Sequence, residues 1–233
     1  MQKSGQNVLK NNNIGSNNQS FYAEGMSYDH LNNDIDISNL IDGRPIYYLV
    51  DASDRVIDSS SDAGTVYCIR CRNITVKDLI MERNDKGIYF YQTAGSLVEN
   101  NTVRDNSWYG IELHESDHNL LKRNNASRSK AGIYLENSSY NTIAANNAFD
   151  NTAGIVLAFG SGNNTIYQNN MVYNENYNAY DPGENQWDDG QRGNFYDDNI
   201  NCTDWERDSL CDSAYRIPPG QSIDRYPLAV PVK

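Results

Sequence analysis

The strongest constraint on the fold is a repeat with a period of about 22 residues. The phrase Gly-apolar-x-apolar begins at positions 87, 110, 132 and 154, in steps of 23, 22 and 22 residues. Weaker copies, "GTVY" at 64 and "NAYD" at 178, extend the series in both directions. Self-similarity at such a period indicates a solenoid, in which each repeat packs only on its neighbours.

A second phrase recurs between these anchors, as "SLVENNTV" at 96, "NLLKRNNA" at 119, "NTIAANNA" at 141 and "NTIYQNNM" at 164. Both phrases alternate apolar and polar residues, which is the period of a β-strand, and no proline interrupts residues 46–181. A leucine-rich repeat would need a helical or 3₁₀ half, and a propeller blade would need roughly 40 residues or more. The pattern therefore predicts an all-β, single-stranded parallel β-helix with about 22–24 residues per coil.

Stacked coils place equivalent residues in rows along the axis. We expect a glycine row, an inward-facing isoleucine row and an asparagine ladder, in which stacked Asn side chains bond the next coil. The glycine row is predicted to contain Gly87, Gly110, Gly132 and Gly154, followed in each coil by Ile88, Ile111, Ile133 or Ile155. The ladder is predicted to contain Asn101, Asn125, Asn147 and Asn170.

The chain divides into three parts of one domain. Residues 1–63 are predicted to form irregular first coils, 64–181 the regular repeats and 182–233 a C-terminal cap. The last part carries Pro, Gly, Trp and acidic residues without a period. A cap is expected because an open strand edge invites end-to-end pairing.

Composition narrows the class of partner. The formal net charge is −12 and the pI is about 4.6, which argues against nucleic acids and anionic membranes. No stretch approaches the roughly 18 apolar residues that cross a bilayer, so no membrane span is predicted. The N-terminal "MQKSGQNVLKNNN" lacks the apolar run of a signal peptide. We therefore expect a cytosolic protein, or an external one whose leader precedes this numbering.

The four cysteines form two pairs. Cys202 and Cys211 close a short polar loop, and we predict a disulfide between them. Cys68 and Cys71 lack a second CxxC or a His pair, so buried thiols or a local bridge are both expected alternatives to a metal site.

The chain resembles the NosD-type β-helix family, also grouped as carbohydrate-binding and sugar-hydrolase (CASH) β-helices. The resemblance lies in the "NTIxxNN…GIxL" repeat, "SNLIDGRPIYYLV", "NQWDDGQRGNFYDD" and the closing "YRIPPGQSIDRYPL", and it covers about residues 28–229. It implies a right-handed parallel β-helix outside the cytoplasm. Relatives include a copper-loading accessory factor, surface-layer modules, polysaccharide-degrading enzymes and uronate epimerases.

The resemblance leaves the metal open. Family members often carry an acidic, calcium-loop-like segment after the WDDG motif, but here the cysteine pair replaces it in "NINCTDWERDSLCDSAY". Calcium stays a possible cofactor. With three His and four Met, the chain is poorly supplied for copper, and no metal ligands are predicted.

The candidate site is a stripe on the outer face of the "GIxL" strands. Alternation places Tyr89, Glu112, Tyr134, Val156 and Tyr180 outward in one row, and Tyr91, His114, Glu136 and Ala158 in the next. Tyr rings suit the C–H faces of sugars and carboxylates accept hydroxyl hydrogen bonds. Tyr89, Tyr91, Tyr134 and Tyr180 are therefore candidate ligand-binding residues.

Two functional classes follow from this stripe. The first is an external, non-catalytic module that binds a polysaccharide or glycan, or that packs against other cell-envelope proteins. The second is a carbohydrate-active enzyme using Glu112, Glu136 and His114 as catalytic residues. We expect the module, because a flat, exposed stripe offers little desolvation and a protonated His114 would lower the pKa of both Glu side chains. A closed groove and a raised carboxyl pKa would favour the enzyme.

Overall fold

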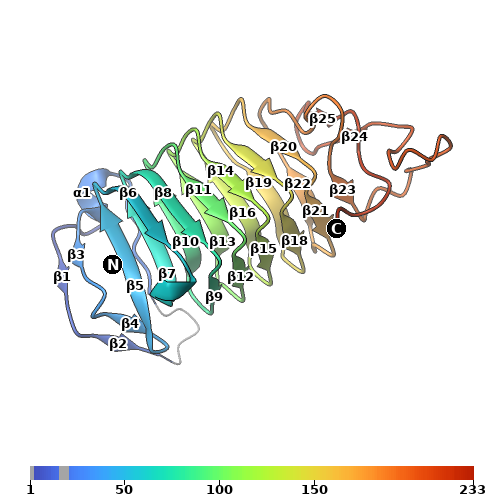
Figure 1. Cartoon of the computed structure of the whole chain (residues 1–233). Helices are drawn as coiled ribbons and strands as arrows, with labels where there is room; N and C mark the ends of the chain where they lie inside the picture. Colours follow the sequence, from blue (N-terminus) through green and yellow to red (C-terminus); the bar gives the residue numbers. More distant parts are fainter. Residues whose placement is uncertain (1–2, 16–20) are drawn as a thin grey trace.

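The structure is a computed structural model that describes residues 3–15 and 21–233; residues 1–2 and 16–20 lie outside the described part. Its coils stack along one axis, with the N-terminal residues at one end and the C-terminal residues at the other (Figure 1). In a typical regular coil one long strand is followed by two short ones, as β10 (Lys86–Tyr91) is followed by β11 (Leu97–Glu99) and β12 (Thr102–Arg104). The predicted parallel β-helix is confirmed.

Three sheets run along the coil stack. The first has nine strands, in the order β2 (Asn13–Ile14), β4 (Leu40–Ile41), β5 (Arg44–Val50), β7 (Thr65–Ile69), β10 (Lys86–Tyr91), β13 (Tyr109–His114), β16 (Ala131–Glu136), β19 (Ala153–Leu157) and β22 (Tyr177–Tyr180). All neighbours in this sheet are parallel except the β4–β5 pair. Parallel pairing in register is what brings equivalent repeat residues into rows.

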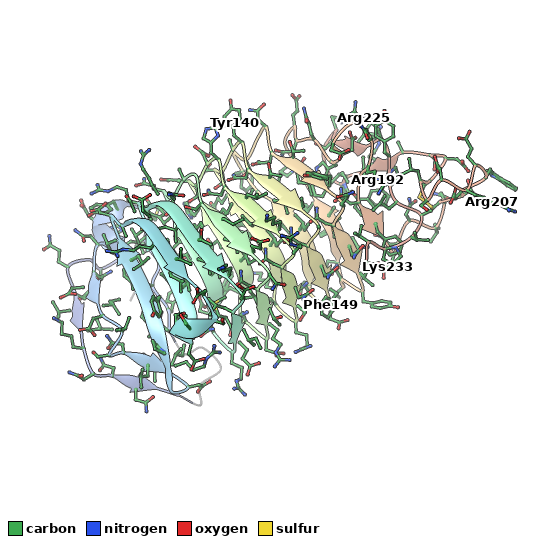
Figure 2. All side chains as sticks on the ribbon, viewed as in Figure 1. Tyr140, Phe149, Arg192, Arg207, Arg225 and Lys233 are labelled. Atoms are coloured by element: carbon green, nitrogen blue, oxygen red, sulfur yellow. A yellow bond between two sulfur atoms is a disulfide. The ribbon has the colours of Figure 1, made fainter. Side chains whose placement is uncertain are left out.

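The other two large sheets have six strands each. One contains β6 (Ser53–Ile57), β8 (Arg72–Lys77), β11 (Leu97–Glu99), β14 (Leu120–Lys122), β17 (Thr142–Ala144) and β20 (Thr165–Tyr167). The other contains β9 (Ile80–Glu82), β12 (Thr102–Arg104), β15 (Asn125–Ser127), β18 (Asn147–Phe149), β21 (Asn170–Val172) and β23 (Phe195–Tyr196). Side chains project outward from the corners between sheets, as the labelled Tyr140 and Phe149 do (Figure 2).

Short elements flank the stack. At the N-terminal end β1 (Val8–Leu9) pairs with β3 (Asp34–Ile35), and α1 (Tyr28–Leu31) precedes β3. A 3₁₀ turn covers Ser59–Ser61. At the other end β24 (Tyr215–Arg216) and β25 (Ile223–Asp224) form an antiparallel pair. Among the described residues, no helix is long and apolar enough to cross a membrane.

The interior of the coils is an apolar column. Ile88, Ile111, Ile133 and Ile155 are fully buried and pair in register, as predicted. Trp187 extends the same core at the C-terminal end, where its indole Nε1 donates to Asp181 at 2.9 Å. Burial of this apolar surface is the main stabilising contribution to such a fold.

The glycine row is required by close contact between coils. A Cβ on Gly110 would lie 2.6 Å from the carbonyl oxygen of Gly132, and one on Gly132 would lie 3.0 Å from that of Gly154. The same Cβ on Gly110 would lie 3.3 Å from Cβ of Ala126 in the core. The row therefore faces inward, against a neighbouring carbonyl, where no larger residue fits.

The predicted asparagine row is correct for Asn125, Asn147 and Asn170 and wrong for Asn101. Thr102, and not Asn101, pairs with Asn125, which in turn lies in register with Asn147 and Asn170. These three Asn form a short outer row, with Nδ2–Oδ1 distances of 2.7 Å. The fully enclosed ladder consists of Asn101, Asn124, Asn146, Asn169 and Asn194.

The displacement follows from the turn before each ladder residue. Arg123 and Ala145 both adopt a left-handed conformation, with φ of +55°. The chain turns there, so the next residue, Asn124 or Asn146, points inward and its Oδ1 accepts from the preceding coil's backbone N–H at 3.0 or 2.9 Å. The following residue already begins an outward strand position. The ladder ends where Asn194 N–H donates to the Asp224 carboxylate at 2.7 Å.

The predicted Cys202–Cys211 disulfide is present. Cys68 and Cys71 are free thiols and both are buried inside the coil. Of the two alternatives for this pair, the structure therefore has the buried thiols.

Candidate functional site

The outer face of the nine-stranded sheet is partly covered by the N-terminal segment 21–31. Phe21 and Leu31 pack with Tyr67, Tyr89 and other outward side chains in an apolar cluster separate from the coil core. The ring of Phe21 meets that of Tyr67 edge-on at 5.1 Å between centroids. This covering segment turns part of the stripe from surface into interior.

The expectation of an exposed stripe is therefore wrong for its first half. The side chains of Tyr89 and Tyr91 are about 1% exposed and that of Glu112 is about 3% exposed. The register itself is as predicted, because Tyr89 pairs with Glu112 and Glu112 with Tyr134. Alternation gives the direction of a side chain but not whether another segment covers it.

A cleft of about 660 Å³ opens beside residues 22–26 of the covering segment. Its lining includes Tyr22, Glu24 and Met26 from the covering segment. The sheet and its flanking turns supply Lys86, Tyr89, Trp108, Tyr109, Glu112, His114, Glu115, Glu136 and Asn137. All three predicted catalytic residues, Glu112, His114 and Glu136, thus line one concave site. The predicted ligand-binding residue Tyr89 lines it too.

Lys86 reaches the cleft because strand alternation breaks at the glycine row. Ile88 is in the core, and a Cβ on Gly87 would also point inward, 2.1 Å from Cγ1 of Val103. Two consecutive inward positions leave the preceding residue facing outward. Lys86 and its register partner Tyr109 consequently line the cleft. Strict alternation would have placed both inward, because each lies two residues before the core isoleucine of its strand.

Lys86 and Glu112 form a buried ion pair. Nζ of Lys86 lies 2.7 Å from Oε2 of Glu112, with both side chains about 5% exposed or less, and the contact is a close charge pair rather than an aligned hydrogen bond. The same Nζ lies 4.2 Å from the centroid of the Tyr89 ring. Burial raises the pKa of Glu112 above its usual value, and the positive charge of Lys86 opposes that rise.

His114 lies between carboxylates from two coils. Its Nδ1 is 3.9 Å from Oε1 of Glu112 and 4.0 Å from Oε2 of Glu136, and its Nε2 is 3.9 Å from Oε1 of Glu115. The first two distances place the carboxyl oxygens of Glu112 and Glu136 less than about 8 Å apart. Burial raises the pKa of Glu112 more than the charges of Lys86 and His114 lower it, so the lowering by His114 has the expected sign but does not determine the net shift.

Asp85 is an uncompensated carboxyl group next to this site. It is about 1% exposed, and neither of its oxygens has a hydrogen-bond partner in the described residues. Burial raises its pKa to about 6, the positive charge of Lys86 lowers it and the negative charge of Glu112 raises it. Buried carboxylates without partners are costly, which is a frequent property of functional sites.

Aromatic rings form one wall of the cleft. Tyr109 stacks on Tyr134 with 4.2 Å between ring centroids and meets Trp108 edge-on at 5.9 Å. Lys130 lies over the Trp108 ring at 3.9 Å. Tyr134, a predicted ligand-binding residue, therefore supports the wall from behind.

Two predicted ligand-binding residues lie elsewhere. Tyr91 is buried beside His114, with ring centroids 5.4 Å apart, and does not line the cleft. Tyr180 lies at the far end of the row, beyond Val156, and contacts Tyr177. The remaining half of the stripe is thus not part of this site.

Sequence analysis missed Lys86, Asp85, Trp108 and Tyr109. The glycine row was the available signal, because a residue before a stacked inward glycine must point outward. The contribution of Tyr22, Glu24 and Met26 had no signal in the repeat pattern.

In the part of the chain that the structure describes, no group of three or more His, Cys, Asp or Glu side chains could hold a metal ion. His118 stacks on Tyr140 at a corner of the coil, away from His114's carboxylates. Cys68 and Cys71 are enclosed in the core.

Comparisons with known proteins place the chain in a family. No curated protein matches it. A crystal structure of a mutant of the periplasmic alginate epimerase AlgG is similar, with 22% identity and a TM-score of 0.46, over 74% of this chain and 41% of that one. The present chain thus spans less than half of that protein. The family described as periplasmic copper-binding protein (NosD) matches residues 32–200, well over half of the chain, which therefore belongs to the NosD family.

Proposed function

We propose that this protein binds a saccharide chain in the cleft beside residues 22–26 of the covering segment. The observation that carries the proposal is the meeting of aromatic rings, carboxylates and a lysine in one concave site, lined by Trp108, Tyr109, Glu112 and Lys86 among others. Another groove, lined by Arg128, Asp150 and Tyr173 among others, has its charged residues on the exposed surface.

Each component of the site suits a sugar ring. The faces of Trp108 and Tyr109 can pack on apolar C–H groups. Carboxylates of Glu112 and Glu136 accept hydrogen bonds from hydroxyl groups, and the ammonium of Lys86 donates them. A mostly preformed cleft with a few convergent polar groups is the usual form of a small-molecule site.

The proposal places the protein outside the cytoplasm. The NosD family is described as periplasmic, and a disulfide between Cys202 and Cys211 is the kind of bond that persists in oxidising compartments. The acidic net charge of −12 is compatible with a glycan-rich environment and opposes binding to nucleic acids.

A second candidate function is hydrolysis of the bound saccharide. Glu112 has the raised pKa of a general acid, because it is buried, and Glu136 on the next strand of the same sheet lies within about 8 Å of it. Protonated Glu112 would donate its proton to the glycosidic oxygen as the bond breaks. The Glu136 carboxylate would activate the water, or attack the sugar carbon before water completes the hydrolysis.

Copper handling, as named in the family description, does not fit the donors of this chain. Copper prefers Cys, Met and His ligands, but Cys68, Cys71, Met81 and Met171 are enclosed in the core. Within the described ranges no group of three or more His, Cys, Asp or Glu side chains could hold a metal ion. We derive no step that passes through copper.

The test is a titration of the purified chain with soluble oligosaccharides by calorimetry, with each mixture also analysed for cleavage products. Tyr109→Ala should weaken binding at least tenfold, and Tyr180→Ala is the matched control outside the cleft. Cleavage that disappears in Glu112→Gln would establish the second candidate. Equal loss of affinity in both Tyr variants, or no binding to any saccharide, would contradict the proposed function.

A further inference from the structure

We propose that the cleft selects saccharides that carry free amino groups, and that Glu136 is the main partner of the bound ammonium group. This inference rests on the proposed saccharide binding and names its ligand class. It follows from the charges around the cleft, where carboxylates outnumber ammonium groups and some carboxylates have no cationic partner.

The cleft is bordered by more carboxylates than cations. Glu24, Glu112, Glu115 and Glu136 line it. Among the described residues, the lysines that line it are Lys3 and Lys86. A ligand that brings positive charge would therefore offset an excess of negative charge.

The pairing inside the site leaves that excess in place. Nζ of Lys86 lies 2.7 Å from Oε2 of Glu112, so this lysine is already paired with a carboxylate of the protein. Asp85, directly before Lys86 in the chain, is buried without a hydrogen-bond partner in the described residues. Lys86 therefore does not offset the charges of both buried carboxyl groups, and negative charge remains beside the cleft.

Glu136 is the carboxylate best placed to receive an amino group. Its side chain is about 35% exposed at the cleft and has no lysine or arginine within ion-pair distance among the described residues. The hydroxyl of Tyr134 is 3.4 Å from Oε2 of Glu136 and holds the carboxylate beside the aromatic wall.

The same charges disfavour the two other ligand classes. A uronate would place its carboxylate among Glu112, Glu115 and Glu136, where like charges repel. A bare divalent cation would need several convergent oxygen ligands, and the described residues form no such group. An organic ammonium needs only one or two carboxylates and an aromatic face.

The experiment compares three oligosaccharides of equal length by calorimetry at about pH 6.5: a β-1,4-glucosamine oligomer, its fully N-acetylated form and an oligogalacturonate. We expect the amino form to bind at least tenfold more tightly than the acetylated form. High salt should reduce that preference, because screening weakens charge pairing. Glu136→Gln should reduce it to less than about threefold, because affinity for the amino form falls much more than affinity for the acetylated form.

Glu184→Gln, which removes an exposed carboxylate in the C-terminal region, is the matched control and should leave the preference unchanged. Equal or tighter binding of the acetylated form or the uronate would overturn the amino-sugar inference while supporting saccharide binding. A preference that survives in Glu136→Gln would overturn the role of Glu136. Failure of all three saccharides to bind would overturn the inference and the proposed function together.

Discussion

The two halves of one sheet face differ in what covers them. In the N-terminal half, the outward residues Tyr67, Tyr89 and Glu112 are buried beneath the segment 21–31. In the C-terminal half, their counterparts Tyr134, Val156 and Tyr180 are only partly buried. The strands are in register and the coil interior is the same in both halves. A covering segment, rather than the repeat, has therefore made one half into a candidate site.

The difference also changes the chemistry of similar side chains. A carboxylate on an open strand face is solvated and ionised at neutral pH. Under the cover, Glu112 lies against Lys86 and Tyr89, and burial raises its pKa. On this regular sheet face, the pKa of a glutamate is thus raised where an irregular segment excludes water.

The largest expected contrast comes from removing one ring in each half. Tyr89→Ala deletes a ring that is about 1% exposed, so the free energy of unfolding should fall by about 3–5 kcal/mol. Tyr180→Ala deletes a partly exposed ring and should cost less than about 1 kcal/mol. Urea denaturation of both variants measures this, and similar losses would show that the cover does not distinguish the two halves.

A smaller effect, equal in both halves, is expected from the shared interior. Gly110→Ala would place a Cβ 2.6 Å from the Gly132 carbonyl oxygen, and Gly154→Ala would place one 2.4 Å from that of Asn178. Each should cost about 2–3 kcal/mol, because the coils must move apart to admit it. The same denaturation assay applies. A variant as stable as the parent would mean that the coil spacing is looser than the structure has it.

The smallest effect is a pH dependence that belongs to the covered half. The pKa of Asp85 is about 6 in the folded protein against 3.8 for the free group, so folding favours its protonated form. Its stabilising contribution is complete below about pH 4 and is lost as the pH rises through 6. We expect stability to fall by about 1–2 kcal/mol over this range, and Asp85→Asn to remove that fall.

Asp224 provides the comparison for this titration in the C-terminal region. Burial raises its pKa to about 7, so it should produce a similar loss of stability at higher pH, which Asp85→Asn leaves intact. Stability measured from pH 4 to 8 separates the two groups. An unchanged profile in Asp85→Asn would mean that Asp85 is solvated in the folded protein.

The interior of this fold could be predicted from the sequence because every coil repeats the same contacts. The positions of Ile88, Ile111 and the glycine row follow from a 22-residue period alone. The repeat predicts Asn101 and Asn125 in one row, but Asn125 pairs with Thr102, the residue after Asn101. A one-residue error is enough to exchange an enclosed ladder for an outer one.

The candidate site could be predicted only in part. Glu112, His114 and Glu136 followed from alternation, whereas Lys86 needed the break in alternation at Gly87. The docking of residues 21–31 could not be predicted, because the segment has no repeat and its contacts with Tyr67 and Tyr89 are distant in the sequence. Without that covering segment, alternation predicts a stripe that is flat and exposed to solvent.

Fluorescence quenching of Trp108 tests the covered cleft as the binding site most directly. In a Trp205→Phe variant, Trp108 is the accessible indole, at 39% exposed, because Trp187 is fully buried. Acrylamide quenching is measured with and without a saturating oligosaccharide. The account predicts that the ligand protects Trp108 and lowers the quenching constant. Unchanged quenching at a concentration at which calorimetry detects binding would place the ligand outside the cleft and contradict the account.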